Sequence, residues 1–100
     1  WVGFVCDERG VLFTGETFAD AEEALAPLEP DVVLVNCVPP DHATAGLREL
    51  LAARDGPCGL YPHIGRFDPP EWYFTDEYPP PKLFDQAQHW CEMGAQVIGG

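Results

Sequence analysis

The hydrophobic positions of this chain alternate between short apolar runs and longer amphipathic stretches. Four short apolar runs have the length of a β-strand and lie at residues 1–6, 32–37, 58–63 and 95–100. Between them, apolar residues recur at helical spacing in three stretches, residues 18–28, 42–55 and 81–93. The order β-α-β-α-β-α-β is typical of an α/β fold, so the chain is predicted to form parallel (β/α) units.

Local signals mark the ends of these segments. The run Val32–Val35 is apolar on both faces, as expected for a parallel strand that is covered on each side. Thr17, with Asp20 three residues later, predicts the start of the first helix. Asp41 is expected to cap the second helix, and Pro81 to lie in the first turn of the third.

The segment between Ile64 and Pro80 is rich in proline and aromatic residues and is predicted to be a loop. Loops of this length are uncommon in compact domains and tend to be functional. Its aromatic residues are candidates for a hydrophobic lid or for a cover over one end of the sheet: Trp72, Tyr73, Phe74 and Tyr78.

Two architectures fit the alternation, a flavodoxin-like sheet and a segment of a (β/α)8 barrel. Periodicity does not separate them. One hundred residues make one small domain and bury only a modest core. The absence of an initiator Met favours a chain that begins within a larger one.

The net charge of the chain argues against two classes of binding partner. Five Lys and Arg against seventeen Asp and Glu give a formal net charge of −12, which argues against nucleic acid and against an anionic membrane surface. No apolar run approaches the roughly 20 residues of a membrane helix. Four cysteines without a C-x-x-C pair favour a reducing compartment, and the protein is expected in the cytoplasm.

Candidate ligand residues follow three of the predicted strands, where parallel α/β folds bind their ligands. Cys6 ends the first strand, Asn36 and Cys37 end the second, and His63 ends the third. Thiolate and imidazole are the usual ligands of zinc. The alternative is that both thiols are buried and the imidazole faces solvent. The other two cysteines, Cys58 and Cys91, are predicted to be packing residues.

Asn36 has two interpretations of its own. A polar amide at the end of an apolar strand must find a partner, because leaving it unpaired costs on the order of 1–3 kcal/mol. It either caps the following loop or holds a polar group of a substrate. The sequence contains no Gly-rich phosphate loop, no G-x-S-x-G elbow and no H-E-x-x-H motif.

Four segments, in this order, resemble the homocysteine S-methyltransferase family. The strand 32–37 resembles the family segment that ends in Asn-Cys, and residues 61–65 resemble its Tyr-Pro-Asn-x-Gly element, with His63 in place of Asn. Residues 90–100 resemble the approach to its Gly-Gly-Cys-Cys motif, and residues 1–16 fit the preceding strand and loop.

The resemblance implies a zinc-dependent enzyme with a (β/α)8 TIM barrel fold. Such an enzyme moves a methyl group from a sulfonium, ammonium or folate donor to the thiol of homocysteine, giving methionine, and holds zinc through three cysteine thiolates. Cys37 matches the first zinc ligand, and Asn36 and His63 are implied to bind substrate. Its partners are these small molecules; the resemblance identifies neither the donor nor an oligomeric state, and no catalytic residue is assigned.

The resemblance also implies that residues 1–100 are a single segment, the C-terminal half of the barrel. The segment is expected to stop just before the paired cysteines, so a complete zinc site needs two further cysteines after Gly100 and the 100 residues alone are expected to be inactive. Within the chain, Cys6 and His63 are the candidates that could replace the two missing cysteine ligands, but ligands after Gly100 are the simpler interpretation. Two other hypotheses are a non-catalytic α/β binding or interaction module with buried cysteines, and a degenerate family member without the full zinc site.

Overall fold

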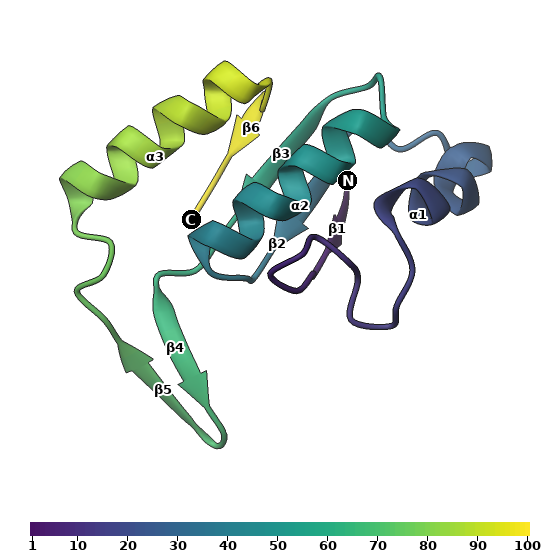
Figure 1. The fold of residues 1–100 in the computed structure, drawn as a ribbon. Coiled ribbons are helices and arrows are strands. Elements are labelled where there is room, and N and C mark those ends of the chain that lie inside the picture. The colour runs from purple at the N-terminus through teal and green to yellow at the C-terminus, as the bar shows by residue number, and fades with distance from the viewer.

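The apolar runs form a four-stranded parallel sheet in the computed structural model, which describes residues 1–100 (Figure 1). Its strands are β1 (Val2–Phe4), β2 (Val33–Asn36), β3 (Cys58–Tyr61) and β6 (Val97–Ile98). All three pairings are parallel, and the order across the sheet is β1-β2-β3-β6. The predicted α/β fold with parallel (β/α) units is confirmed.

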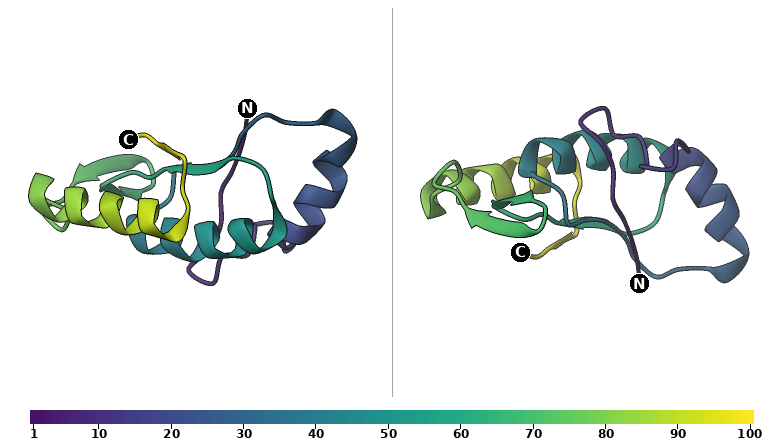
Figure 2. Two further views of the ribbon diagram at one scale, coloured as in Figure 1. Left: turned by 90° about the horizontal axis from the view of Figure 1, so that it is seen from above. Right: turned by 90° about the horizontal axis from the view of Figure 1, so that it is seen from below.

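The strands follow one another across the sheet in chain order. A flavodoxin-like sheet reverses its strand order at a switch point and carries helices on both faces. Here the helices α1 (Phe18–Leu25), α2 (Pro40–Ala53) and α3 (Pro80–Met93) lie on one face, and the opposite face carries none (Figure 2). The four strands contain no switch point, which disfavours the flavodoxin-like alternative, and they form an open sheet.

The core lies between the sheet and the helices. Val33 and Val35 of β2 are fully buried there, as are Leu47 and Leu50 of α2 and Trp90 of α3. Trp90 also donates a hydrogen bond from Nε1 to Oγ1 of Thr44 in α2, at 2.8 Å. Gln86 of α3 donates to the same oxygen from Nε2 at 3.3 Å, so the two long helices are joined by packing and by two hydrogen bonds.

The helix starts follow the sequence signals only in part. Thr17 caps α1 as predicted: its Oγ1 accepts from the amide of Asp20, and the Asp20 carboxylate accepts from the amide of Thr17. The predicted cap at Asp41 is wrong, because α2 begins one residue earlier at Pro40 and no side chain caps it. A proline at the first helical position needs no partner for an N–H group, so the helix can start there.

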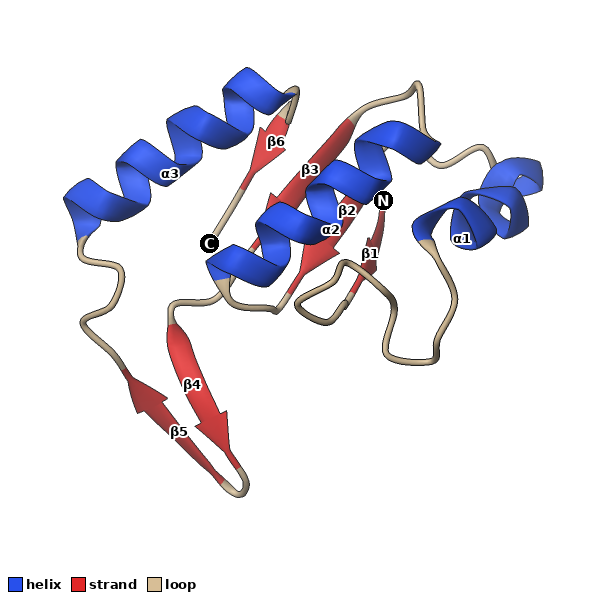
Figure 3. Ribbon diagram, viewed as in Figure 1, coloured by secondary structure: helices blue, strands red, loops and turns tan.

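The predicted loop between Ile64 and Pro80 contains a β-hairpin. Strands β4 (Gly65–Asp68) and β5 (Glu71–Phe74) pair antiparallel, and they extend away from the main sheet (Figure 3). Every side chain of β5 is exposed, so the strand lacks the alternation of buried and exposed positions that marks a strand in a sequence.

Arg54, directly after α2, joins several elements at the amino-terminal end of the sheet. Its Nη1 lies 3.1 Å from Oε2 of Glu22 in α1, and both side chains are mostly buried. Its Nη2 donates to the carbonyl of Pro30 at 2.6 Å, and its Nε donates to that of Pro57 at 3.2 Å. One guanidinium therefore ties α1 to the segments that lead into β2 and β3.

Glycines form the floor of the helix-free face. A Cβ atom at Gly3 would overlap with the Asn36 amide, and one at Gly99 would overlap with the Tyr61 ring. A Cβ atom at Gly59 would overlap with the carbonyl oxygen of Val97. Atoms of neighbouring strands therefore occupy the space above these glycines, and the Asn36 side chain fits only because Gly3 has no side chain.

Candidate functional site

The chain segments that carry Asn36, Cys37 and His63 meet at the carboxyl edge of the sheet. Asn36 is the last residue of β2 and pairs in register with Tyr61, the last residue of β3. The amide of Cys37 donates to the carbonyl of Tyr61 at 2.9 Å, and the amide of His63 donates to that of Val38 at 3.1 Å. These backbone bonds continue the β2–β3 pairing past the strands and bring the three predicted residues to one place.

Asn36 has an unpartnered polar atom in this site. Its Oδ1 is buried and has no hydrogen-bond partner, and its side chain makes no hydrogen bond to the loop that follows. The interpretation of Asn36 as a cap of its own loop is therefore wrong. A buried amide oxygen without a partner is costly, and it is available to accept a hydrogen bond from a ligand.

Cys37 presents its thiol to solvent at the end of β2. Its φ of 54° places the backbone in the left-handed region, which non-glycine residues rarely adopt. Such conformations concentrate at functional sites, where surrounding contacts hold them, and here the amide of Cys37 is held by Tyr61. The alternative that Cys37 is a buried packing residue is wrong.

Cys6 is inaccessible. Its side chain is completely buried under α2, and its Sγ lies 3.5 Å from the carbonyl oxygen of His42. Burial, and to a lesser extent the charge of Asp7, raises the pKa of Cys6 to about 11. The thiol is packed against the backbone of α2 with no exposed surface, which argues against Cys6 as a substitute for a missing zinc ligand.

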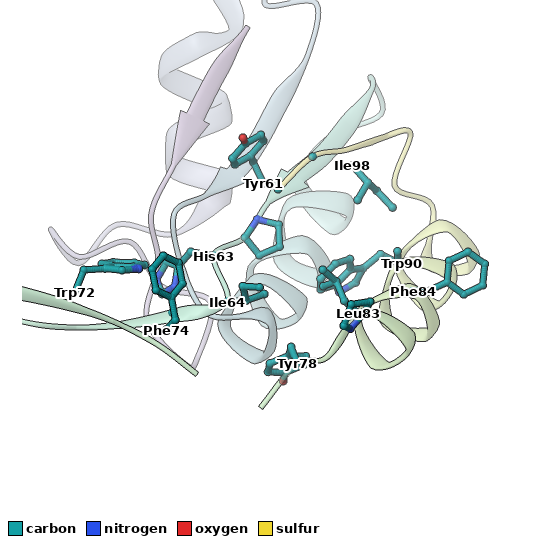
Figure 4. A pocket seen from close by; sticks show the side chains of 16 residues that line it. Tyr61, His63, Ile64, Trp72, Phe74, Tyr78, Leu83, Phe84, Trp90 and Ile98 are labelled. Atoms are coloured by element: carbon teal, nitrogen blue, oxygen red, sulfur yellow. The ribbon is translucent and has the colours of Figure 1, made fainter. Parts of the chain in front are cut away.

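His63 lies where two cavities meet. It lines an open apolar cavity of about 750 Å³, bordered by the ends of β3 and β6, the hairpin and α3 (Figure 4). It also lines a second cavity of about 410 Å³, beside the start of α2. Its ring packs edge-to-face against Trp72, with 4.8 Å between ring centroids, and its Nδ1 is buried without a partner. The alternative that His63 merely faces solvent is wrong.

The comparison with known families decides the relationship of this chain. A family model described as homocysteine S-methyltransferase matches residues 1–100. The chain belongs to the homocysteine S-methyltransferase family. No curated protein and no solved structure matches it. The family suggested by the Asn-Cys and Tyr-Pro-His segments is therefore confirmed, and with it a relationship to enzymes that transfer methyl groups.

The described residues do not by themselves fit the zinc ion implied by the family. No group of three or more His, Cys, Asp or Glu side chains is arranged to hold a metal ion. Of the predicted thiol ligands, Cys37 is exposed and Cys6 is buried. One accessible thiol falls short of the three or four protein ligands of a stable zinc site.

The sequence predicts the strand-end positions of Asn36, Cys37 and His63, but it does not predict the cavity beside them, and Cys6 lies apart from this site. Trp72, Phe74 and Tyr78 line that cavity together with Leu83 and Trp90 of α3. The cluster of aromatic residues in a proline-rich segment predicts a cover, but only the structure shows which of them line the cavity. Separately, none of the helices has the length and apolar character needed to cross a membrane.

The four cysteines are expected to react in two classes. Cys37 and Cys91 are exposed, whereas Cys6 and Cys58 are buried and burial raises the pKa of both buried thiols. The sequence prediction was right for Cys58 and wrong for Cys91. With a thiol reagent at neutral pH, two thiols should react rapidly and two only after unfolding. Peptide mapping identifies them, and slow labelling of Cys37 would contradict its position.

The stability of the fold is expected to fall at alkaline pH through Cys6. The folded state keeps the thiol proton up to about pH 11, whereas the unfolded chain loses it near the ordinary value of 9.0. Stability from this group is present below pH 9 and is lost as pH rises from 9 to 11. The loss should reach about 2–3 kcal/mol. Urea unfolding across this range checks it, and Cys6→Ala should flatten the profile.

Proposed function

We propose that these residues form the C-terminal half of a (β/α)8 barrel in a zinc-dependent homocysteine S-methyltransferase. Sequential parallel strands with helices on one side are the repeating unit of such a barrel, whose active site lies at the carboxyl ends of its strands. The observation that carries the proposal is the meeting of Asn36, Cys37 and His63 at that edge, in a chain that the family model matches throughout.

Each of the three residues has its own role in the proposal. Cys37 supplies one thiolate to a zinc ion whose other ligands lie outside these 100 residues. When bound, zinc would lower the pKa of a coordinated thiol. Asn36 and His63 contact the homocysteine, because each holds a buried polar atom that a ligand could pair: Oδ1 accepts a hydrogen bond, and Nδ1 accepts or donates according to its protonation.

The proposed reaction gives methionine from homocysteine. A bond forms between the homocysteine sulfur and the methyl carbon while the bond from that carbon to the donor breaks, and the thiol proton is released. The donor belongs to the sulfonium, ammonium or folate class. We place the protein in the cytoplasm, which the four free cysteines support.

Zinc retention in the enzyme with its complete ligand set tests the role of Cys37. We expect Cys37→Ser to lose stoichiometric zinc and methyl transfer, because a hydroxyl is a poor zinc ligand compared with a thiolate. Cys91→Ser is the matched control, since Cys91 is also exposed but lies in α3. Elemental analysis after dialysis measures the metal. Full zinc content in Cys37→Ser would exclude Cys37 as a ligand.

The same enzyme tests Asn36. Asn36→Ala should raise the KM for homocysteine by about 10- to 100-fold, which corresponds to the loss of one buried hydrogen bond with its partner left unpaired. The 100 residues alone, assayed in parallel, should methylate no homocysteine. If neither the enzyme nor its zinc-loaded form acts on homocysteine, a non-catalytic binding module becomes the better explanation.

A further inference from the structure

No hydrogen bond of the structure fixes the orientation of the His63 ring. Its Nδ1 is buried and unpartnered, and only its backbone amide is anchored, by the carbonyl of Val38. A histidine side chain has two torsion angles to settle, so its packing neighbours decide where the ring lies. The aromatic neighbour is Trp72 of β5, whose indole meets the ring edge-to-face at 4.8 Å and an interplanar angle of 73°.

The hairpin holds Trp72 in this contact. Gly65 lies directly under the indole, where a Cβ atom would overlap with Nε1. Phe67, the cross-strand partner of Trp72, packs against it with ring centroids 6.0 Å apart. Thr75 closes the base of the hairpin, because its hydroxyl donates to the carbonyl of Ile64 at 2.9 Å. Gly65 and Phe67 therefore contact the indole from within the hairpin, and the His63 ring packs against it from outside the hairpin.

The position of this pair matters because His63 separates two different environments. The apolar cavity on one side is lined by aromatic and aliphatic side chains, and the cavity on the other side contains Asp41, His42 and Glu77. Figure 4 shows Trp72 and His63 on the hairpin side of the apolar cavity, opposite Leu83 and Trp90. A ring free to turn would alter the wall of both cavities.

We propose that Trp72 is a positioning residue, which holds the His63 imidazole in one orientation in the candidate site and thereby sets the affinity of the site for homocysteine. Its effect on the His63 ring does not depend on the proposed function, whereas its effect on homocysteine rests on it. A ring held in place before binding loses less conformational freedom on binding, so the benefit lies in affinity and not in the chemical step.

Three variants of the enzyme separate this role from general damage. Trp72→Ala removes the contact, Trp72→Phe keeps an aromatic edge, and Gly65→Ala displaces the indole without deleting it. The control is Tyr73→Ala, since Tyr73 neighbours Trp72 on β5 but its hydroxyl bonds Glu71 and its side chain lines neither cavity. Thermal unfolding of all four variants establishes that the fold is retained.

The first measurement is acylation of His63 by diethyl pyrocarbonate, mapped by mass spectrometry, with the exposed His89 of the same molecule as internal standard. We expect the ratio of His63 to His89 labelling to rise severalfold in Trp72→Ala and Gly65→Ala. It should stay near the wild-type value in Trp72→Phe and Tyr73→Ala. An unchanged ratio in both Trp72→Ala and Gly65→Ala would overturn the proposal.

The second measurement is steady-state kinetics with homocysteine at saturating donor. We expect Trp72→Ala to raise the KM by about two- to tenfold with kcat within twofold of wild type, and Trp72→Phe to restore most of the KM. An unchanged KM, or an equal rise in Tyr73→Ala, would overturn the role in affinity. If the wild-type enzyme does not use homocysteine but the His63 labelling still responds, the proposed function fails and the positioning of His63 stands.

Discussion

Trp90→Ala is expected to destabilise the fold by about 3–5 kcal/mol. Trp90 is the largest side chain that is completely buried, and it fills the space between α2, α3 and the sheet. Its removal leaves a cavity and also ends the hydrogen bond to Thr44. Domains of this size have a total stability of about 5–15 kcal/mol, so the variant should lie close to the limit of folding.

Urea unfolding measures this loss, and Phe84→Ala is its matched control. Phe84 lies on the same helix and is also aromatic, but its side chain is 63% exposed, so its removal should cost less than about 1 kcal/mol. Thr44→Val keeps the shape of the side chain but removes the acceptor of the indole N–H, together with the bonds of this hydroxyl to Gln86 and to the carbonyl of Pro40, and should cost about 1–3 kcal/mol. A loss below 1 kcal/mol in Trp90→Ala would show that α3 packs differently.

Arg54→Ala is expected to have the second largest effect, about 2–4 kcal/mol. The variant leaves the mostly buried carboxylate of Glu22 without its partner and removes the donors to Pro30 and Pro57. Glu22 already has one buried oxygen, Oε1, without a hydrogen bond, so the uncompensated charge has no other neutralising contact. The damage lies at the amino-terminal end of the sheet, away from the candidate site.

Arg48→Ala provides the control for this prediction. Arg48 carries the same charge and lies within α2, but it is exposed and makes no ion pair, so its removal should change stability by less than about 0.5 kcal/mol. The double variant Glu22→Ala with Arg54→Ala should be less destabilised than the sum of the single variants. Additive losses would show that the two side chains do not interact in solution.

The sequence predicts the sheet and the strand-end residues because both depend on local patterns. An uninterrupted apolar run followed by Asn36 and Cys37 marks where a strand stops, and parallel strands stop at the same edge. The cap at Thr17 is equally local, since both partners lie within one turn. The hairpin was missed because Pro69 and Pro70 at its turn, and the exposure of every residue of β5, hide its strands.

Local sequence patterns do not predict which of the cysteines are buried. Cys6 is enclosed because α2 approaches the sheet closely at Gly46, where a Cβ atom would lie 2.7 Å from the Cys6 Sγ. That contact joins residues forty positions apart. Cys91 follows Trp90 in the apolar stripe of α3, but only Trp90 is buried in that helix, because β6 is two residues long and covers a narrow strip. How many residues of a helix are buried depends on the width of the sheet that it packs against.

The glycine floor of the helix-free face also has a consequence for how the family can vary at these positions. A side chain at Gly3 would need the space that the Asn36 side chain occupies, and a side chain at Gly99 would need the space of the Tyr61 ring. A larger residue at either glycine would displace the side chain above it. A substitution at Gly3 alone would therefore displace the Asn36 amide, which is proposed to contact homocysteine. These positions can therefore diverge only as pairs, and a relative that lacks Gly3 should also have replaced Asn36.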